Sequence, residues 1–456
     1  MNEPKTVPPA TEKSYILDSY RNVLDQQVID GVGENDTDNI FEERKGETTG
    51  LSFASFNYIN SIVGSGVIGI AFALHQAGFV TGLFLLGFVA LVTDYSLILM
   101  VRSAHISGSF SYQGLMEAAF GRPGFYLLTF LQFVYPFIAM VSYNVVVGDT
   151  VTKVLIRVFG LTPGSLFARR DYVVAMATIF VTIPLCLLKD MAKLARASFM
   201  SLIFIIFILS TIFTRFISLA PLIGSTENSW KVYNWGVVPA IGIMAFAFMC
   251  HHNVFLLYAS IEDADQEKWD RVTHYSVFTS FIIACLFGIT GYATFTGYSQ
   301  GDLLENYCWD DDLMNAARIA FSLTILLTFP IECLVTRSVI SQAYRPVSHF
   351  FSTIIIVGAT FLISISTDCL GVVLELNGVI SAVPLAFILP AASYIKLEEG
   401  SILSKRKLPA FGVALFGSVV AVLGLATIVT TFSTVDRCSH GHIMPYCYQL
   451  ANHTKN

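Results

Sequence analysis

Charged residues are scarce in this sequence of 456 residues: 13% are Asp, Glu, Lys or Arg, whereas 54% are hydrophobic. A water-soluble domain usually carries about 25% charge, so there is too little charge here to cover a soluble surface. The mean hydropathy of +0.64 predicts a chain whose outer surface faces a lipid bilayer. The net charge of −6 and the absence of a basic stripe give no footprint for nucleic acid.

Short motifs of metal and catalytic sites are also missing. The sequence has no Cys-x-x-Cys pair, no His-Glu-x-x-His and no Gly-x-Ser-x-Gly, which are typical of zinc sites and hydrolases. An enzyme is therefore not expected, and neither is a resident cofactor. Nothing in the sequence implies an oligomer.

Long hydrophobic runs are abundant. A membrane-spanning helix needs about 20 mostly apolar residues, and its backbone must satisfy its hydrogen bonds within the segment. The sequence predicts an all-α, polytopic membrane protein with about eleven transmembrane helices. The expected spans are roughly 52–75, 79–101, 124–148, 172–188, 196–219, 236–258, 274–297, 315–336, 349–367, 370–394 and 409–432.

The ends of the chain are polar. Residues 1–50 are often acidic and lack the apolar stretch of a cleaved signal peptide, so a disordered cytosolic tail is expected before a transporter domain at 51–432. With the N-terminus inside, 18 of the 27 Lys and Arg residues fall on the inner side. The positive-inside rule then predicts an extracytosolic tail at 433–456. The plasma membrane is favoured over a lysosomal or other internal membrane.

The first span contains a glycine cluster at Gly64-Ser65-Gly66, with Gly69 close behind. Such a cluster weakens a helix at mid-membrane, and an unwound turn exposes backbone N–H groups that suit a carboxylate. Secondary transporters build their central sites from broken helices. The alternative is close helix packing through small residues.

The sixth span is interrupted at Phe246-Ala247-Phe248, which is followed by polar residues from His251 onward. This pattern indicates a second break, whose carbonyl groups would accept an amino group or a cation. An intact helix with a polar end is the alternative. Each candidate break lies in the first span of a block of five spans, and the blocks cover about 51–219 and 236–394. Because five is an odd number of crossings, the second block would have the opposite orientation in the membrane to the first, which is the inverted-repeat arrangement of many transporters.

Several polar residues lie inside predicted spans, where they are costly and often functional. His251, Glu332 and Glu375 are candidates for a proton or gating path, although structural pairing is the alternative for each. Asn60 and Thr324 offer neutral oxygens that suit Na⁺. For a threonine in a helix, the alternative is a hydrogen bond back to its own helix.

Five segments carry a resemblance to a known family. They are Phe56-Asn57 through Gly69, Phe246 to His251, Gly297-Tyr298 with Gly301-Asp302, Phe329-Pro330, and Leu374 to Gly378. Over residues 50–435 the chain resembles the amino acid/auxin permease family. The resemblance implies a LeuT-type 5+5 inverted repeat with one extra C-terminal helix, and sodium-coupled transport of neutral amino acids with Asn60 and Thr324 at the sodium ion.

One departure from the family bears on function. His252-Asn253 stands where better-known members have Pro-Glu, which leaves the coupling ion open between Na⁺ and a proton. The expected function is a secondary active transporter that carries neutral amino acids with Na⁺ by alternating access. A proton-coupled transporter and a non-transporting amino acid sensor are the alternatives.

The remaining cysteines of interest lie in polar stretches. Cys308, Cys438 and Cys447 share the extracytosolic side in the predicted topology, where disulfides persist. The pair Cys438–Cys447 is preferred because it closes a short loop, and Cys308 with either tail cysteine follows closely. The sequon at Asn452 is a candidate glycosylation site on the same side.

Overall fold

The computed structural model describes residues 51–162, 164–188, 191–343, 348–367, 369–402, 404–431 and 444–448. The elements of this part of the chain are all helices. Ten of them are long and apolar enough to cross a membrane, and a bent pair adds an eleventh span. The predicted all-α polytopic fold is confirmed. The predicted N-terminal tail, Cys438 and Asn452 lie outside the described residues.

The first five spans all overlap their predicted positions, and the third extends furthest beyond its prediction. They begin with a broken span and end with a long single helix. In chain order they are α3 (Leu51–Ile62) with η1 (Ser65–Gly69) and α4 (Ile70–Ala77), α5 (Phe79–Ser107), α6 (Tyr112–Phe159), α7 (Arg170–Ala177) with η3 (Thr178–Thr182) and α8 (Ile183–Leu187), and α9 (Met191–Ile223).

The next six spans again begin with an interrupted helix. Short 3-10 turns η5 (Thr296–Tyr298) and η6 (Leu303–Asn306) follow the seventh span. The spans are α10 (Val237–Ala247) with η4 (His251–Asn253) and α11 (Val254–Ser260), α12 (Gln266–Phe295), α13 (Asp312–Ala343), α14 (His349–Ser366), α15 (Leu370–Asn377) with η7 (Gly378–Ala382), η8 (Pro384–Ile388) and α16 (Leu389–Leu397), and α17 (Leu408–Thr431).

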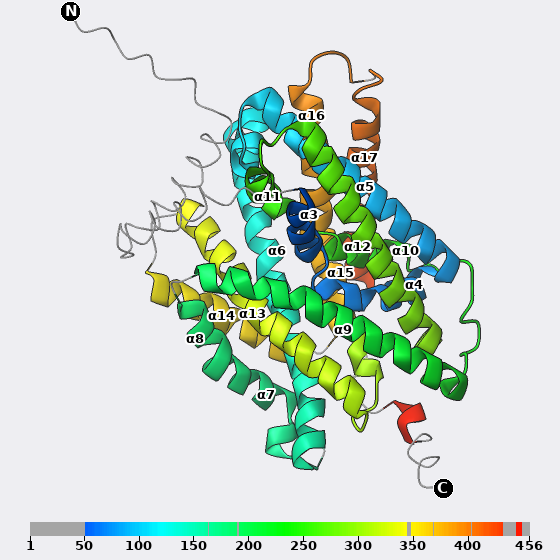
Figure 1. The fold of residues 1–456 in the computed structure, drawn as a ribbon. Coiled ribbons are helices and arrows are strands. Elements are labelled where there is room, and N and C mark those ends of the chain that lie inside the picture. The colour runs from blue at the N-terminus through cyan, green and yellow to red at the C-terminus, as the bar shows by residue number, and fades with distance from the viewer. Residues whose placement is uncertain are drawn as a thin grey trace, which may run out of the picture.

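The spans differ in how deeply they lie within the bundle. In the span 237–260, 78% of the most apolar 18-residue stretch is buried inside the protein, whereas in the span 408–430 only 17% of the corresponding stretch is buried. Figure 1 shows α3, α4, α10 and α15 at the centre, with α7 and α17 at opposite sides of the bundle. The two interrupted spans are therefore central, and the eleventh helix is peripheral, with most of its surface available to lipid.

One helix is much longer than the sequence predicts. The predicted span 124–148 lies within α6, which runs from Tyr112 to Phe159 with a non-helical residue at Gly121 (φ 66°, ψ −159°). Glycine adopts this positive φ without the steric cost that other residues meet, and Pro123 follows two residues later. The kink at Gly121 divides α6 into two helical segments, and the longer one, which follows the kink, still extends beyond the predicted span as far as Phe159.

Candidate functional site

The first span is broken where the glycine cluster predicts. α3 ends at Ile62, Gly64 is extended (φ −111°, ψ −152°), and a new helix starts at Ser65. The two halves, 54–62 and 65–77, are bent by 45° relative to each other. The predicted break is confirmed. The first N–H groups of the second half, at Ser65 and Gly66, have no acceptor within their own helix.

The sixth span is interrupted as well. α10 ends at Ala247, and Phe248 (φ −98°, ψ 7°) and Cys250 (φ −138°, ψ 5°) leave the helical conformation before η4 begins at His251. The predicted second interruption is confirmed, and an intact helix with a polar end is wrong. At the end of α10 the Phe248 N–H donates to the Met244 carbonyl at 3.1 Å and the Met249 N–H donates to the Phe246 carbonyl at 3.2 Å, and the regular helical pattern stops there.

The two breaks lie against each other. A Cβ atom placed on Gly66 would lie 2.6 Å from the Cα of Ala247, so only glycine allows this approach. A second link joins the same spans, because the Asn253 Nδ2 donates to the Ser61 Oγ at 3.1 Å. Close packing, the alternative considered for Gly66, is therefore real. It also brings the predicted substrate-binding residues of both breaks together.

Two tyrosines of α6 complete this region. Tyr143 interacts with Ser65 of the first break and with Glu332 of α13. The Tyr135 ring lies 5.8 Å from Phe246 and 5.6 Å from His252, measured between ring centroids. The sequence did not single out these tyrosines. A pattern in the sequence could have identified them, because polar residues recur at helical spacing in this otherwise apolar span. These residues are all buried, and they are Gln132, Tyr135, Ser142 and Tyr143.

The sodium candidates have different surroundings. The Asn60 Oδ1 is buried and has no hydrogen-bond partner in the described part of the chain. The Thr324 Oγ1 donates to the Ala320 carbonyl at 3.0 Å, the helix-internal bond named above as the alternative. A hydroxyl that donates in this way keeps its lone pairs as acceptors. Both sodium assignments stay predictions.

The predicted proton or gating residues have different neighbours. His251 is fully buried, and its Nε2 lies 3.2 Å from the Ser96 Oγ of α5. Glu332 is buried in α13 beside the α6 tyrosines, and its Oε2 has no hydrogen-bond partner among the described residues. Glu375 is buried on α15. A proton or gating path through these residues stays a prediction.

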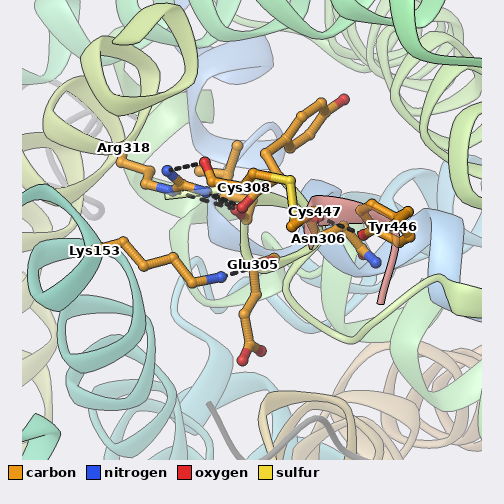
Figure 2. The surroundings of a disulfide bond; sticks show 9 residues. Lys153, Glu305, Asn306, Cys308, Arg318, Tyr446 and Cys447 are labelled. Carbon is orange, nitrogen blue, oxygen red and sulfur yellow. Dashed lines mark hydrogen bonds between the residues drawn. A yellow bond between two sulfur atoms is a disulfide. The ribbon is translucent and has the colours of Figure 1, made fainter. Parts of the chain in front are cut away.

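A disulfide joins the loop 299–311 to the tail. Cys308 is bonded to Cys447, with 5.7 Å between their Cα atoms (Figure 2). The preferred pairing of Cys447 with Cys438 is therefore wrong, and the second choice is formed. The reason is a contact between segments far apart in the sequence. The Tyr446 hydroxyl donates to the Asn306 carbonyl, and its ring stacks on Phe295 with centroids 5.7 Å apart.

Buried charges hold the same loop in place. Arg318 of α13 is fully buried and donates to the carbonyl groups of Leu304, Tyr307 and Cys308. Asp302, in the loop itself, is 1% exposed. Burial raises the pKa of Asp302 to about 7, and nearby Glu305 adds to the rise. Cys369 is also disulfide-bonded.

Residues 47–434 match the family described as Transmembrane amino acid transporter protein. A Danio rerio protein is 45% identical over 409 residues, which cover 88% of this chain and 91% of the relative. Its name is "Putative sodium-coupled neutral amino acid transporter 11". A Rattus norvegicus protein of the same name is 46% identical over 408 residues, covering 88% of this chain and 89% of the relative.

The fold is similar to that of MhsT, solved in complex with L-phenylalanine. The two structures superpose with a TM-score of 0.52 at 14% sequence identity, over 81% of this chain and 98% of MhsT. At this identity the likeness concerns the fold alone. It confirms the predicted LeuT-type architecture.

Proposed function

Because the chain belongs to the transmembrane amino acid transporter protein family, we propose that it carries neutral amino acids together with Na⁺ by alternating access. It is an integral, multi-pass amino acid transporter and not an enzyme. The observation that carries the finer proposal is the direct contact of two broken spans at Gly66 and Ala247. Alternating access would then involve movement of a repeat at about 51–219 against a repeat at about 236–394.

The carboxylate of the substrate binds at the first break in this proposal. The helix that begins at Ser65 continues to Ala77, so its dipole places positive partial charge at the N–H groups of Ser65 and Gly66. Backbone donors of this kind recognise the group that all amino acids share. Gly64 has no heavy atom within 4 Å of the position of an added Cβ, which leaves space beside these donors.

The second break supplies the complementary acceptors. A backbone carbonyl oxygen has two lone pairs, so the last carbonyl groups of α10 would accept from the ammonium group of the substrate. The residues named at the two breaks, from Gly64 to Gly66 and from Phe246 to Phe248, are uncharged. A charged substrate side chain would meet no counter-ion from them, which supports a preference for neutral amino acids.

Sodium coupling is supported by the unpartnered Oδ1 of Asn60. A buried carbonyl oxygen without a donor is costly, and a hard cation that prefers neutral oxygens would satisfy it. Thr324 is proposed as a second ligand through its remaining lone pairs. The names of the two relatives above support the same coupling ion.

Proton coupling is the second candidate, and one observation favours it. The Glu332 Oε2 is buried without a hydrogen-bond partner in the part of the chain that the structure describes. Glu332 also lies near Tyr143, which contacts Ser65 at the first break. A proton on Glu332 would remove the cost of a buried carboxylate and could link protonation to the substrate site.

Orientation in the membrane is also proposed. Disulfides persist on the extracytosolic side, and the Cys308–Cys447 bond supports placing the loop 299–311 and the tail there. Since up to eleven candidate spans lie between residue 51 and the segment 444–448 in the described part of the chain, the chain before the first span is then proposed to be cytosolic. We place the protein in the plasma membrane, and surface biotinylation of intact cells tests this location.

Uptake by the purified protein in proteoliposomes tests the function. Labelled neutral amino acids should accumulate when an inward Na⁺ gradient is imposed, and not when K⁺ replaces Na⁺. Uptake that follows a pH gradient and ignores Na⁺ would favour the proton-coupled alternative. Saturable binding without uptake under either gradient would contradict transport and favour the amino acid sensor.

A further inference from the structure

We propose that a cavity beside the C-terminal end of α6 is a second binding site, separate from the two helix breaks, for a small zwitterion with an ammonium and a carboxylate group. The cavity has a volume of about 470 Å³. Lys153, on its wall, lies ten residues beyond Tyr143, which corresponds to about 15 Å along a helix. It is therefore distinct from the region around Ser65 and Ala247.

The walls come from five separate parts of the chain. Four of them are the last turns of α6, the segment that enters α7, the loop 299–311, and the tail segment 444–448. The end of α14 completes the lining. Figure 1 shows the tail segment, in red, at the same end of the bundle as α7. A cavity framed by segments this far apart in sequence depends on the tertiary fold.

Asp149 supplies an acceptor that the protein leaves unused. Its side chain is 4% exposed and lines the cavity. The Oδ1 accepts from the Arg170 Nε at 2.7 Å, but the Oδ2 is buried without a hydrogen-bond partner in the described residues. An unused carboxylate oxygen in a buried site is costly, and a ligand ammonium group would satisfy it.

Arg170 cannot turn to this second oxygen without losing other bonds. Its Nη1 donates to the Ser364 carbonyl at 3.2 Å, and its Nη2 donates to the Thr367 carbonyl at 3.1 Å. The guanidinium group is thus held between α6 and the end of α14. Its role is to fix Asp149, which leaves the Oδ2 available to a ligand.

Lys153 supplies the complementary donor. It lines the same cavity, and its ammonium group donates to the Glu305 carbonyl, toward which it points in Figure 2. An ammonium group has three N–H donors, so this bond leaves donors for a carboxylate. Asp149 and Lys153 are four residues apart on α6, which places them on one face with about 6 Å between their Cβ atoms.

Charged side chains of both signs line the cavity. Asp149, Asp171 and Glu305 are acidic, and Lys153 and Arg170 are basic. An ion of one sign would meet like charges on part of this lining, and uncompensated charge in a buried site is costly, whereas a zwitterion presents a group of each sign.

The tail forms one wall through the disulfide. Met444 and Cys447 line the cavity, and Cys447 is bonded to Cys308, which lines it as well. The Tyr446 hydroxyl holds the same segment on the Asn306 carbonyl. Opening the disulfide would release this wall and let the ligand leave faster.

Equilibrium binding of labelled L-alanine to the full-length protein in lipid nanodiscs tests the site. The Gly66→Val variant removes the first break as a binding site, because no side chain fits there. We expect saturable binding to persist in Gly66→Val and to weaken about tenfold or more when Lys153→Gln is added, the loss of one charged hydrogen bond. Lys231→Gln, at an exposed lysine, is the matched control and should change nothing.

Ligand analogues and the tail provide a second, independent measurement. Alanine methyl ester lacks the carboxylate and N-acetylalanine lacks the ammonium group, so neither should compete at the Gly66→Val site. Cys447→Ser should accelerate dissociation from that site, whereas Cys285→Ser, at a free cysteine, should not. Competition by both analogues at full strength would overturn the assignment of a zwitterion.

The binding data separate this inference from the proposed function. If Gly66→Val, folded and monodisperse, binds no L-alanine, the cavity holds water only and the second site is wrong. If Gly66→Val binds like the wild type and Lys153→Gln alone abolishes binding, the central site of the proposed function is wrong instead. Two binding components in the wild type, one removed by Gly66→Val and the other by Lys153→Gln, would support both the central site and the second site.

Discussion

Gly66 and Ala247 are in backbone contact: a Cβ atom on Gly66 would lie 2.6 Å from the Ala247 Cα and 3.1 Å from its backbone N. This contact holds two interrupted helices together at the centre of the bundle. Neighbouring Gly64, by contrast, faces open space. The glycine cluster thus allows close backbone packing at Gly66 and leaves free volume at Gly64.

Substitution of Gly66 should therefore abolish transport without affecting insertion into the membrane. The side chain of Gly66→Val collides with backbone, which cannot yield as a flexible side chain can, and overpacking of this kind costs about 1–3 kcal/mol. The measurement is uptake per molecule at the cell surface. Gly412→Val, in α17 where nothing lies within 4 Å, is the matched control. Wild-type uptake by Gly66→Val would contradict a site between the breaks.

Removal of a sodium ligand should change the dependence on Na⁺ more than the affinity for substrate. We expect Asn60→Ala and Thr324→Ala to raise the Na⁺ concentration for half-maximal uptake by about tenfold, since each removes one oxygen from the ion. Thr430→Ala is the control, because its hydroxyl makes the same helix-internal bond on the peripheral α17. If Na⁺ dependence is unchanged and Glu332→Gln removes a pH dependence of uptake, protons are the coupling ion.

The disulfide can be tested directly by mass spectrometry. Four candidate spans, from Asp312–Ile340 to Leu408–Thr430, separate Cys308 from Cys447. An even number of crossings puts both cysteines on the same side in either orientation. Non-reducing digestion should yield a peptide that links Cys308 to Cys447, and Cys447→Ser should remove it. A peptide that links Cys447 to Cys438 instead would overturn the pairing.

Asp302 should make thermal stability depend on pH. The pKa of Asp302 in the folded state is about 7, above the usual value of 3.8. Between about pH 4 and about pH 7 the folded protein therefore keeps a proton on Asp302 that the unfolded protein has lost. Stability should rise as the pH falls from about 7 to about 4, and this pKa difference corresponds to at most about 4 kcal/mol.

The Asp302→Asn variant isolates this contribution. Asparagine keeps an oxygen for the Leu304 N–H, which the Asp302 Oδ1 accepts at 2.8 Å, but it does not titrate. The melting temperature of the variant should be higher than that of the wild type at pH 8, and the difference should shrink toward pH 5. Asp263→Asn, at an exposed position, should follow the wild type at every pH. Parallel pH profiles for Asp302→Asn and the wild type would contradict a neutral-range pKa at Asp302.

Much of the fold is predictable because lipid imposes a simple rule on the chain. Each apolar run has to be a helix, so the spans and both interruptions could be predicted from composition and from glycine and polar residues at mid-span. The extent of α6 could not, because the signal ends where polar residues such as Arg122 begin, whereas the helix continues on both sides.

The partners of individual side chains were beyond the sequence. Tyr143 reaches Ser65 from a different span, and the partner of Cys447 is 139 residues away. A short loop favoured Cys438 for entropic reasons, but the packing of Tyr446 on Phe295 decided the pairing. The sequence also does not identify Asp149 and Lys153 as binding residues, because the cavity that they line is formed only when the loop, the tail and α6 pack together.

The disulfide has a consequence for how the protein is made. Ribosomes deliver Cys308 before Cys447, which follows 139 residues later. The bond can form only after the four intervening helices have been inserted and Cys447 has reached the same side of the membrane as Cys308. Its formation thus reports the insertion of these four helices, and a chain in which one of them is not inserted would leave Cys308 as a reduced thiol.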